Sequence, residues 1–162
     1  MFEQDEFWMR KAIESAAAAG NLNEVPIGAC LIDEQGELLA IAGNRTITTS
    51  DPTAHAEILV LREAAALIGN YRLTETVLYT TIEPCTMCAG ALVNARIKRL
   101  VFGAHDERFG AIESVFQICN TSSLNHKIEI TSGVLAEDCR HLMQEFFKGK
   151  RLAKGERRKE KG

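Results

Sequence analysis

The sequence predicts a single α/β domain of three layers, an α/β/α sandwich in which helices cover both faces of a mixed β-sheet. The chain has 162 residues, which is enough for one domain with one sizeable core. Segments of strand composition alternate with segments of helical periodicity, and the first two strands form a hairpin. No internal repeat, low-complexity linker or Pro/Gly-rich joint divides the chain.

The first half of the chain is expected to contain a helix, a hairpin and a second helix. Residues 5–19 carry apolar side chains at helical spacing, namely Met9, Ala12, Ile13 and Ala16. Apolar runs at 27–32 and 38–42 flank the turn sequence at 33–36, so they predict two buried strands joined by a turn. Residues 54–68 are apolar almost all round, which is typical of a helix covered on several sides.

The second half continues the alternation of strands and helices. Residues 77–82 are β-branched and aromatic and predict a strand, 86–95 a helix, and 99–104 another strand. Residues 105–126 are irregular, with one helical turn expected near 114–118. A strand over 127–131 and a closing helix over 136–152 follow, and that helix is expected to turn three side chains towards the core: Leu142, Phe146 and Phe147.

Composition places the protein in the cytoplasm. No apolar run of about 18 residues is present, so no membrane span is expected. The first residues contain no apolar segment followed by a small-residue cleavage site, so no signal peptide is expected. In that compartment the five cysteines are expected to be thiols or metal ligands rather than disulfides: Cys30, Cys85, Cys88, Cys119 and Cys139.

The C-terminal end of the chain is basic, whereas the remainder is acidic. Residues 148–162 hold eight basic and two acidic residues, a net charge of +6, which leaves −9 for the rest because the total is −3. We expect residues 1–152 to form the domain and residues 153–162 a disordered basic tail. This pattern is compatible with nucleic-acid contact and also with a solvated terminus that aids solubility.

Three residues have the donor atoms and the spacing of a zinc site. Cys85 and Cys88 follow Pro84 at the start of a predicted helix, where residues three apart share one face and thiolates are favoured. His55 stands at the corresponding place, at the start of the preceding helix. Three protein ligands leave a fourth position for water, which is the arrangement of a catalytic zinc. We therefore expect one Zn²⁺ per chain.

Glu57, two residues after His55, supplies the proton carrier that a hydrolytic deamination requires. One carboxylate can take a proton from the attacking water and deliver protons to the ring nitrogen and the leaving amine. The order H-x-E followed by P-C-x-x-C is the signature of zinc-dependent nucleobase deaminases, and here it reads His55-Ala56-Glu57 and Pro84-Cys85-Thr86-Met87-Cys88. Cys30 and Cys139 are expected in the core. No spacing ties the remaining cysteine or histidines to the metal, and they are expected to be loop or surface residues: Cys119, His105, His126 and His141.

At these residues the sequence resembles the bacterial tRNA-specific adenosine deaminases, which belong to the cytidine deaminase-like superfamily. The resemblance extends over residues 5–152, and its most specific segments are VPIGA at 25–29, GNR at 43–45, DPTAHAEI at 51–58, LYTTIEPCTMCAGALVNARIKRLVFGAHD at 78–106 and NHKIEIT at 125–131. It implies a five-stranded sheet of order 2-1-3-4-5 and a homodimer. It also implies conversion of a wobble adenosine to inosine in a tRNA anticodon loop, with zinc-bound hydroxide attacking C6.

The resemblance also assigns roles to further residues. His55, Cys85 and Cys88 match the family's zinc ligands, and Glu57 matches its proton shuttle. Asn44 matches the asparagine that binds the flipped purine, and Asp106 the aspartate beside the anticodon-loop ribose. Four residues match the helix laid against the RNA loop: Phe146, Phe147, Lys150 and Arg151.

Other interpretations of these residues and of the whole chain stay open. Asn44 is a turn residue when the family is set aside, Asp106 a loop-capping carboxylate, and the two phenylalanines core residues. The same zinc motif is compatible with a deaminase of free guanine, cytosine or cytidine. A catalytically silent zinc-binding subunit of an editing complex is a third hypothesis, against which the presence of Glu57 argues.

Overall fold

A computed structural model of the protein describes residues 2–161. Within that range four α-helices, five β-strands and one 3₁₀ turn follow one another along the chain: α1 (Phe2–Asn21), β1 (Gly28–Ile32), β2 (Leu38–Gly43), α2 (Ala56–Ile68), β3 (Val77–Ile82), α3 (Thr86–Ala95), β4 (Arg99–Ala104), η1 (Ile118–Asn120), β5 (Glu129–Thr131) and α4 (Ala136–Glu160). The predicted bounds of β3, α3 and β4 are confirmed.

The five strands form one mixed sheet of order β2-β1-β3-β4-β5. Strand β1 is antiparallel to both β2 and β3, whereas β3, β4 and β5 are parallel. Strands β2, β3 and β4 therefore point in the same direction, and their carboxyl ends meet at one edge of the sheet. The predicted α/β class, strand number and strand order are confirmed.

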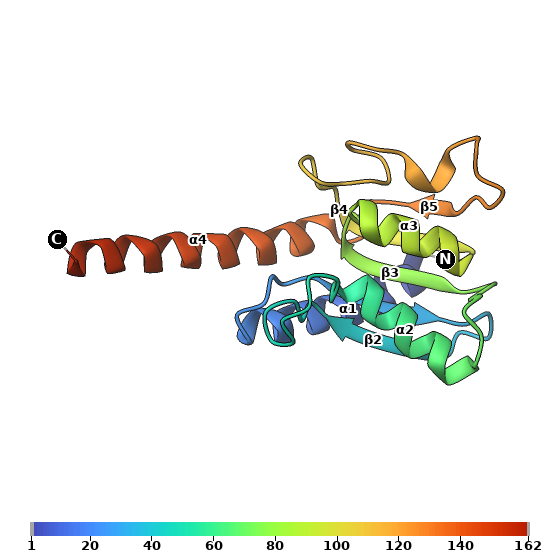
Figure 1. The fold of residues 1–162 in the computed structure, drawn as a ribbon, viewed down its shortest axis with the longest axis horizontal. Helices are drawn as coiled ribbons and strands as arrows, with labels where there is room; N and C mark the ends of the chain where they lie inside the picture. Colours follow the sequence, from blue (N-terminus) through green and yellow to red (C-terminus); the bar gives the residue numbers. More distant parts are fainter. Residues whose placement is uncertain (1, 162) are drawn as a thin grey trace.

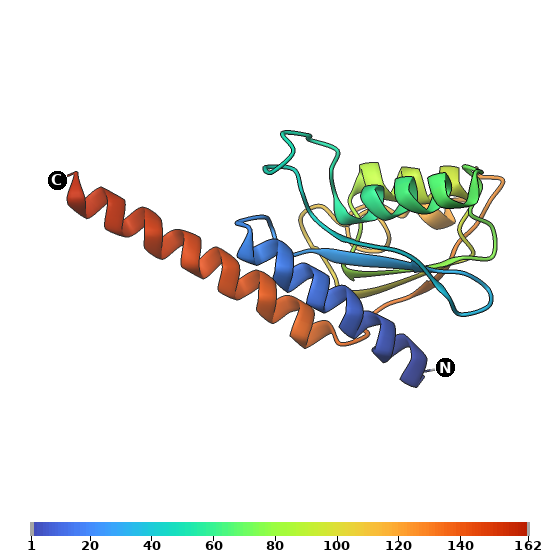
Figure 2. The same ribbon diagram turned by 90° about the horizontal axis from the view of Figure 1, so that it is seen from below.

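Helices cover both faces of the sheet, as the three-layer prediction requires. Figure 2 shows α1 and α4 side by side below the sheet and α2 and α3 above it. An apolar core lies on each face of the sheet. Alternate residues of β1 pack into one core or the other, because successive side chains of a strand point to opposite faces. Ala29 and Leu31 pack with α2 and α3, and Cys30 and Ile32 pack with α1 and α4. A strand buried on both faces reads as a continuous apolar run, as residues 27–32 do.

The irregular segment after β4 differs from the prediction. Its regular turn is the 3₁₀ helix at Ile118–Asn120 and not a turn near 114–118. The N–H of Ile118, which would close a turn over 114–118 on the Ser114 carbonyl, donates instead to the Ala111 carbonyl at 3.0 Å. Strand β5 begins at Glu129, two residues after the expected position.

Helix α4 is longer than predicted, and one of its phenylalanines faces solvent. It continues to Glu160, eight residues past the expected end, because Ala, Lys, Arg and Glu dominate this stretch and all favour helix. Its second half projects beyond the sheet (Figure 1), so no core is available there. Phe147 is 42% exposed, which corrects the expectation that it faces the core; Cys139 and Met143 pack there instead.

The helices of residues 2–161 include none that is both long and apolar enough to cross a membrane.

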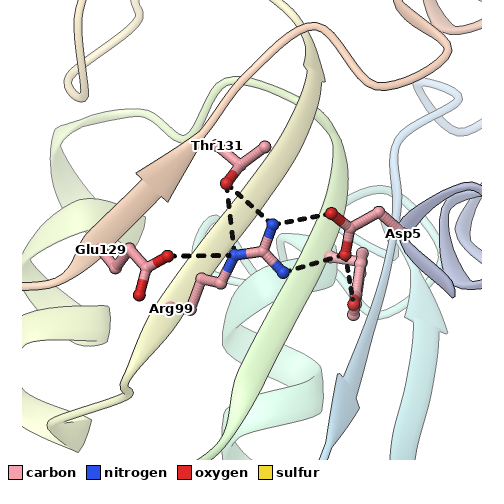
Figure 3. A network of polar contacts seen from close by, with 5 residues as sticks. Asp5, Arg99, Glu129 and Thr131 are labelled. Atoms are coloured by element: carbon pink, nitrogen blue, oxygen red, sulfur yellow. Dashed lines mark hydrogen bonds and ion pairs between the residues drawn. The ribbon is translucent and has the colours of Figure 1, made fainter. Parts of the chain in front are cut away.

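A partly buried ion pair joins Asp5, near the start of α1, to Arg99, the first residue of β4 (Figure 3). The guanidinium of Arg99 donates to both carboxylate oxygens of Asp5, at 2.9 and 2.7 Å, and also to the Thr131 hydroxyl. The Tyr79 hydroxyl donates to the same carboxylate at 2.9 Å. Burial alone raises the pKa of Asp5, but the hydrogen bonds from Arg99 and Tyr79 outweigh it and hold that pKa below its usual value.

Asp5→Asn should lower the free energy of unfolding by about 3 kcal/mol at pH 7, because it leaves the Arg99 charge without its buried partner. Since the pKa of Asp5 is lowered on folding, its contribution is complete above the unfolded pKa of about 3.9 and is lost as the pH falls further. Urea denaturation from pH 7 to pH 3 measures both effects. A variant whose stability falls with acid as steeply as that of the wild type would contradict this role of Asp5.

Candidate active site

Several residues predicted to bind metal or substrate lie at the edge of the sheet where β2, β3 and β4 end. Asn44 follows β2 directly, Cys85 follows β3 by three residues, and Asp106 follows β4 by two. Figure 1 shows the loops after β2 and β4 on the same side of the body, the side from which α4 projects. In open α/β sheets, ligands commonly bind outside the carboxyl ends of strands.

Two helices begin at the residues expected to bind metal. His55 is the N-cap of α2 and Cys85 is the N-cap of α3, both with extended backbone. Their carbonyls accept the first helical hydrogen bonds, from Leu59 at 3.0 Å and from Ala89 at 2.8 Å. Asp51 fixes the approach to His55 by accepting from the N–H and hydroxyl of Thr53, at 2.8 and 2.7 Å. Because a helix N-terminus carries partial positive charge, both sites favour an anionic ligand such as thiolate or hydroxide.

The donor atoms of His55, Cys85 and Cys88 converge. Nδ1 of His55 lies 3.5 Å from the sulfur of Cys85 and 3.5 Å from that of Cys88. All three donor atoms lie within 4.8 Å of one another. A tetrahedral zinc ion, with Zn–S of about 2.3 Å and Zn–N of about 2.0 Å, holds sulfur and nitrogen about 3.5 Å apart. The three residues therefore fit zinc in both donor type and spacing.

The two thiols of the cluster differ in acidity. Hydrogen bonding to Cys88 lowers the pKa of Cys85 to about 4, and His55 contributes further. The same hydrogen bond, together with burial, raises the pKa of Cys88. Hydrogen bonding to Cys85 raises the pKa of His55. Cysteine binds zinc as the thiolate, so metal binding at this cluster releases protons.

Glu57 is a buried carboxyl group next to this cluster. Its side chain is 3% exposed, and its Oε1 finds no hydrogen-bond partner among the residues that the structure describes. Burial raises the pKa of Glu57 to about 7. A buried oxygen without a partner is costly, so its persistence indicates that another group is meant to occupy the space beside it. A water molecule bound as the fourth ligand of a zinc ion in this cluster would satisfy this requirement.

Asn44 supports the turn that carries His55 and Glu57. Its Oδ1 accepts a hydrogen bond from the backbone N–H of Ala56 at 2.8 Å, and its own N–H donates to the Ile27 carbonyl at 3.0 Å. The side chain is buried. This bond uses one of the two acceptor sites of Oδ1, so Asn44 can offer a ligand its Nδ2 hydrogens and the second acceptor site.

Asp106 caps the loop that follows β4. Its Oδ1 accepts from the backbone N–H groups of Arg108 and Phe109, at 3.0 and 3.2 Å. Oδ1 of Asp106 therefore acts as a loop cap, and Oδ2 is available to a ligand. The side chain is half-buried at the same edge of the sheet as the metal cluster.

The sequence-based predictions missed two buried carboxylates that hold the loops around the cluster. Glu83 accepts hydrogen bonds from the loop after β4, and Glu24 accepts from Ile47 and Thr48 in the loop after β2. Hydrogen bonds outweigh the effect of burial in both groups and lower their pKa values. One signal was available, since both lie in apolar surroundings one or two residues before a proline.

The residues expected to contact RNA on α4 lie apart from the metal cluster in the sequence, on the helix that projects from the body (Figure 1). Phe146 is half-buried and packs edge-to-face against Phe147, with 5.4 Å between ring centroids. Nζ of Lys150 lies 5.4 Å from the Phe146 ring centroid. Arg151 is exposed, as are most residues of the helix beyond it.

The remaining cysteines and histidines lie outside the cluster, as predicted. Cys30 and Cys139 are buried in the core, as expected, but Cys119 is buried there too, which corrects the expectation of a loop or surface residue. Burial raises the pKa of each of the three thiols to about 12. His126 contacts the carbonyl of Ile97 at 2.7 Å, and His105 faces Glu113 at 3.2 Å.

Sequence comparison relates the chain to known deaminases. Residues 3–151 match the model of the MafB19-like deaminase family. The chain is 51% identical over 152 residues to a tRNA-specific adenosine deaminase of Haemophilus influenzae, a match that covers 94% of this chain and 88% of that protein. It is 42% identical over 156 residues to the tRNA-specific adenosine deaminase of Bacillus subtilis, covering 96% of each.

Structural comparison gives the same relationship. A solved structure from a study of A-to-I editing by tRNA:A34 deaminases at the wobble position of transfer RNA matches with a TM-score of 0.81 and 42% identity, covering 84% of this chain and 98% of that one. A guanine deaminase of Nitrosomonas europaea matches with a TM-score of 0.73 and 26% identity, covering 87% and 83%. The resemblance predicted from the motifs is confirmed. The chain belongs to the MafB19-like deaminases and, among them, to the family of the tRNA-specific adenosine deaminases.

Proposed function

We propose that the protein is a zinc-dependent hydrolase that converts the wobble adenosine of a tRNA anticodon loop to inosine. One observation carries the proposal: a cluster of three metal donors adjoins a buried carboxyl group whose Oε1 has no partner within residues 2–161. A structural zinc site normally has four protein ligands and needs no such acid. The combination supports hydrolysis rather than structural metal binding.

Glu57 moves the protons of the reaction. Bound zinc supplies the Lewis acidity that lets water lose a proton near neutral pH. Glu57 accepts that proton and delivers it to N1 of adenine as the water oxygen adds to C6. It then carries the proton of the new C6 hydroxyl to the exocyclic amine. The C6–N bond breaks, ammonia leaves, and the C6 carbonyl of inosine forms. A carboxyl group with a pKa of about 7 is matched to both accepting and donating protons at neutral pH.

The chain also carries features that fit an RNA substrate. The Nδ2 group of Asn44 can donate to an acceptor on the purine edge. The basic half of α4 extends from the side of the body that holds the site loops (Figure 1), where Lys150, Arg151 and the cations beyond them can contact phosphates. An adenine in a single-stranded loop reaches a buried site at little unstacking cost, whereas a duplex adenine does not.

A second candidate function is deamination of a free base, which the structural likeness to the guanine deaminase of Nitrosomonas europaea favours. The metal cluster and Glu57 serve either reaction equally well. The higher identity to the tRNA-specific adenosine deaminases and the basic half of α4 favour RNA.

Two substrates separate these candidates. The purified protein should convert adenosine to inosine at the wobble position of an anticodon stem-loop, and it should leave a matched stem-loop with cytidine at that position unchanged. It should release no ammonia from free guanine, cytosine or cytidine. Mass spectrometry of the digested RNA and an ammonia assay measure the products. Turnover of guanine without any inosine in the RNA would overturn the proposal in favour of the free-base candidate.

We propose further that the protein acts as a homodimer, as the family resemblance implies. The outer side of α2 and α3 supports this, because Leu67, Ile68 and Tyr71 are exposed there. A neighbouring cavity of 320 Å³ has a largely apolar lining that includes Ile58, Leu61 and Ala91. Exposed apolar surface of this kind is typical of a face that meets another protein, here a second subunit.

A further inference from the structure

Glu83 organises the whole first part of the loop that follows β4. Its Oε1 accepts hydrogen bonds from the backbone N–H of Asp106, at 3.1 Å, and from the Ser114 hydroxyl. Its Oε2 accepts from three consecutive backbone N–H groups at 3.1, 2.8 and 2.9 Å, which belong to Ile112, Glu113 and Ser114. One carboxylate, 3% exposed, therefore receives five hydrogen bonds from residues 106–114.

The loop closes tightly around this carboxylate. A side chain at Gly110 would collide with the Glu83 carboxyl carbon and would lie 2.5 Å from the carbonyl oxygen of Asp106. The N–H of Ala111 donates to the Pro84 carbonyl at 2.8 Å, and the N–H of Gly110 donates to the Asp106 carbonyl at 2.9 Å. The loop backbone is consequently fixed against Glu83-Pro84 at several separate points.

Through these contacts the loop is connected to the metal cluster by only a few residues. Glu83 precedes the metal-binding Cys85 by two residues, and its carboxylate holds the N–H of Asp106. The position of Asp106 relative to the cluster is thus set by one side chain and two peptide units. A core anchor elsewhere, such as Asp5 beneath the sheet, has no comparable connection to the site.

The side chains that this fixed loop presents outward are those of a binding surface. Phe109 is 68% exposed and Phe116 is 53% exposed, although the backbone around them is extensively hydrogen-bonded. Arg108 is exposed next to Phe109. Aromatic side chains of this kind stack on unpaired bases, and a neighbouring guanidinium contacts phosphate.

We propose that Glu83 is a positioning residue that fixes Asp106 and the loop at 106–116 in place to receive the RNA around the target nucleotide. The inference rests on the proposed RNA function and adds a residue that acts through the loop rather than on the reacting atoms. Glu83→Gln preserves shape, but its amide –NH₂ cannot accept hydrogen bonds, so it loses part of the set that now reaches the carboxylate.

The test compares Glu83→Gln with Asp5→Asn, a matched carboxylate-to-amide change at a buried site remote from the metal cluster. Zinc content, melting temperature, kcat and KM on the adenosine stem-loop are measured for each. Both variants should melt at lower temperature and retain zinc. Glu83→Gln should raise KM for the RNA about tenfold or more, with a smaller fall in kcat, while Asp5→Asn should change neither constant.

A double-mutant cycle with Asp106→Ala separates positioning from general stabilisation. If Glu83 acts by positioning Asp106 and its loop, the KM increase of the double variant should fall well short of the product of the two single increases, because Asp106→Ala removes part of what Glu83 positions. The inference is overturned if the two effects multiply, or if Glu83→Gln has the kinetic constants of the wild type. The proposed function still stands in either case, provided that the wild type edits the RNA. A wild type that leaves the stem-loop unedited overturns both.

Discussion

Glu57→Gln is expected to abolish turnover while leaving zinc content and fold intact. General acid–base groups contribute about 10²–10⁴-fold to the rate, and here two proton transfers depend on one carboxyl group, so the loss should reach at least about 10³-fold. Single-turnover conversion of adenosine in the stem-loop measures the rate. Elemental analysis of the same preparation measures the zinc.

The stability of this variant should change little. Oε1 of Glu57 makes no hydrogen bond within the described residues, and the amide oxygen of glutamine can keep the hydrogen bonds with Cys88 and the Glu57 backbone. Burial already raises the pKa of this carboxyl group to about 7, so its charged form is disfavoured in the folded protein. Buried groups kept for catalysis commonly cost stability. A variant that loses zinc as readily as a cysteine variant would show that Glu57 is a metal ligand.

The sequence predicted the sheet and the metal cluster because both depend on local patterns. Strand β3 and helix α3 carry uninterrupted composition signals and were placed at their observed bounds. His55 and Cys85 each follow a proline by one to three residues at the start of a helix, and the parallel course of β2, β3 and β4 brings their loops together. Short motifs at helix starts thus located a site formed by distant parts of the chain.

The supporting carboxylates were not predictable in the same way. Glu83 receives hydrogen bonds from residues 23 to 31 positions further along the chain, and Glu24 from residues 23 and 24 positions away. Neither periodicity nor a motif specifies such partners. The contacts of Glu83 exist only once β3 and β4 are paired, and those of Glu24 only once β1 and β2 are paired. The helical turn expected near 114–118 does not form because the N–H of Ile118 reaches back to the Ala111 carbonyl, a pairing that composition does not specify.

The end of α4 was missed for a different reason. The charge of residues 153–162 suggested a solvated tail, yet the same residues have high helix propensity and continue α4 to Glu160. Charge density and helix propensity are independent properties. The position of Phe147 follows from the same cause, because a helix that leaves the sheet leaves its outer side chains uncovered.

Removal of one cysteine ligand should have the largest effect of all. Cys88→Ala leaves two protein donors, so zinc should be lost and inosine formation should fall to background. Cys119→Ala is the matched control, since it makes the same change at another buried cysteine of the core above the sheet. It should keep zinc and activity and lose only the small free energy of a buried sulfur, about 1 kcal/mol.

Thermal unfolding distinguishes loss of the metal from loss of packing. A ligand that binds only the folded state raises stability by RT ln(1 + [L]/Kd), so zinc added to chelated wild type or to Cys119→Ala should restore the melting temperature. The same addition should leave Cys88→Ala unchanged, because the remaining donors, His55 and Cys85, bind zinc too weakly to hold it. If zinc stabilised Cys88→Ala as much as the wild type, the metal would be bound elsewhere. The assignment of His55, Cys85 and Cys88 as its ligands would then be wrong.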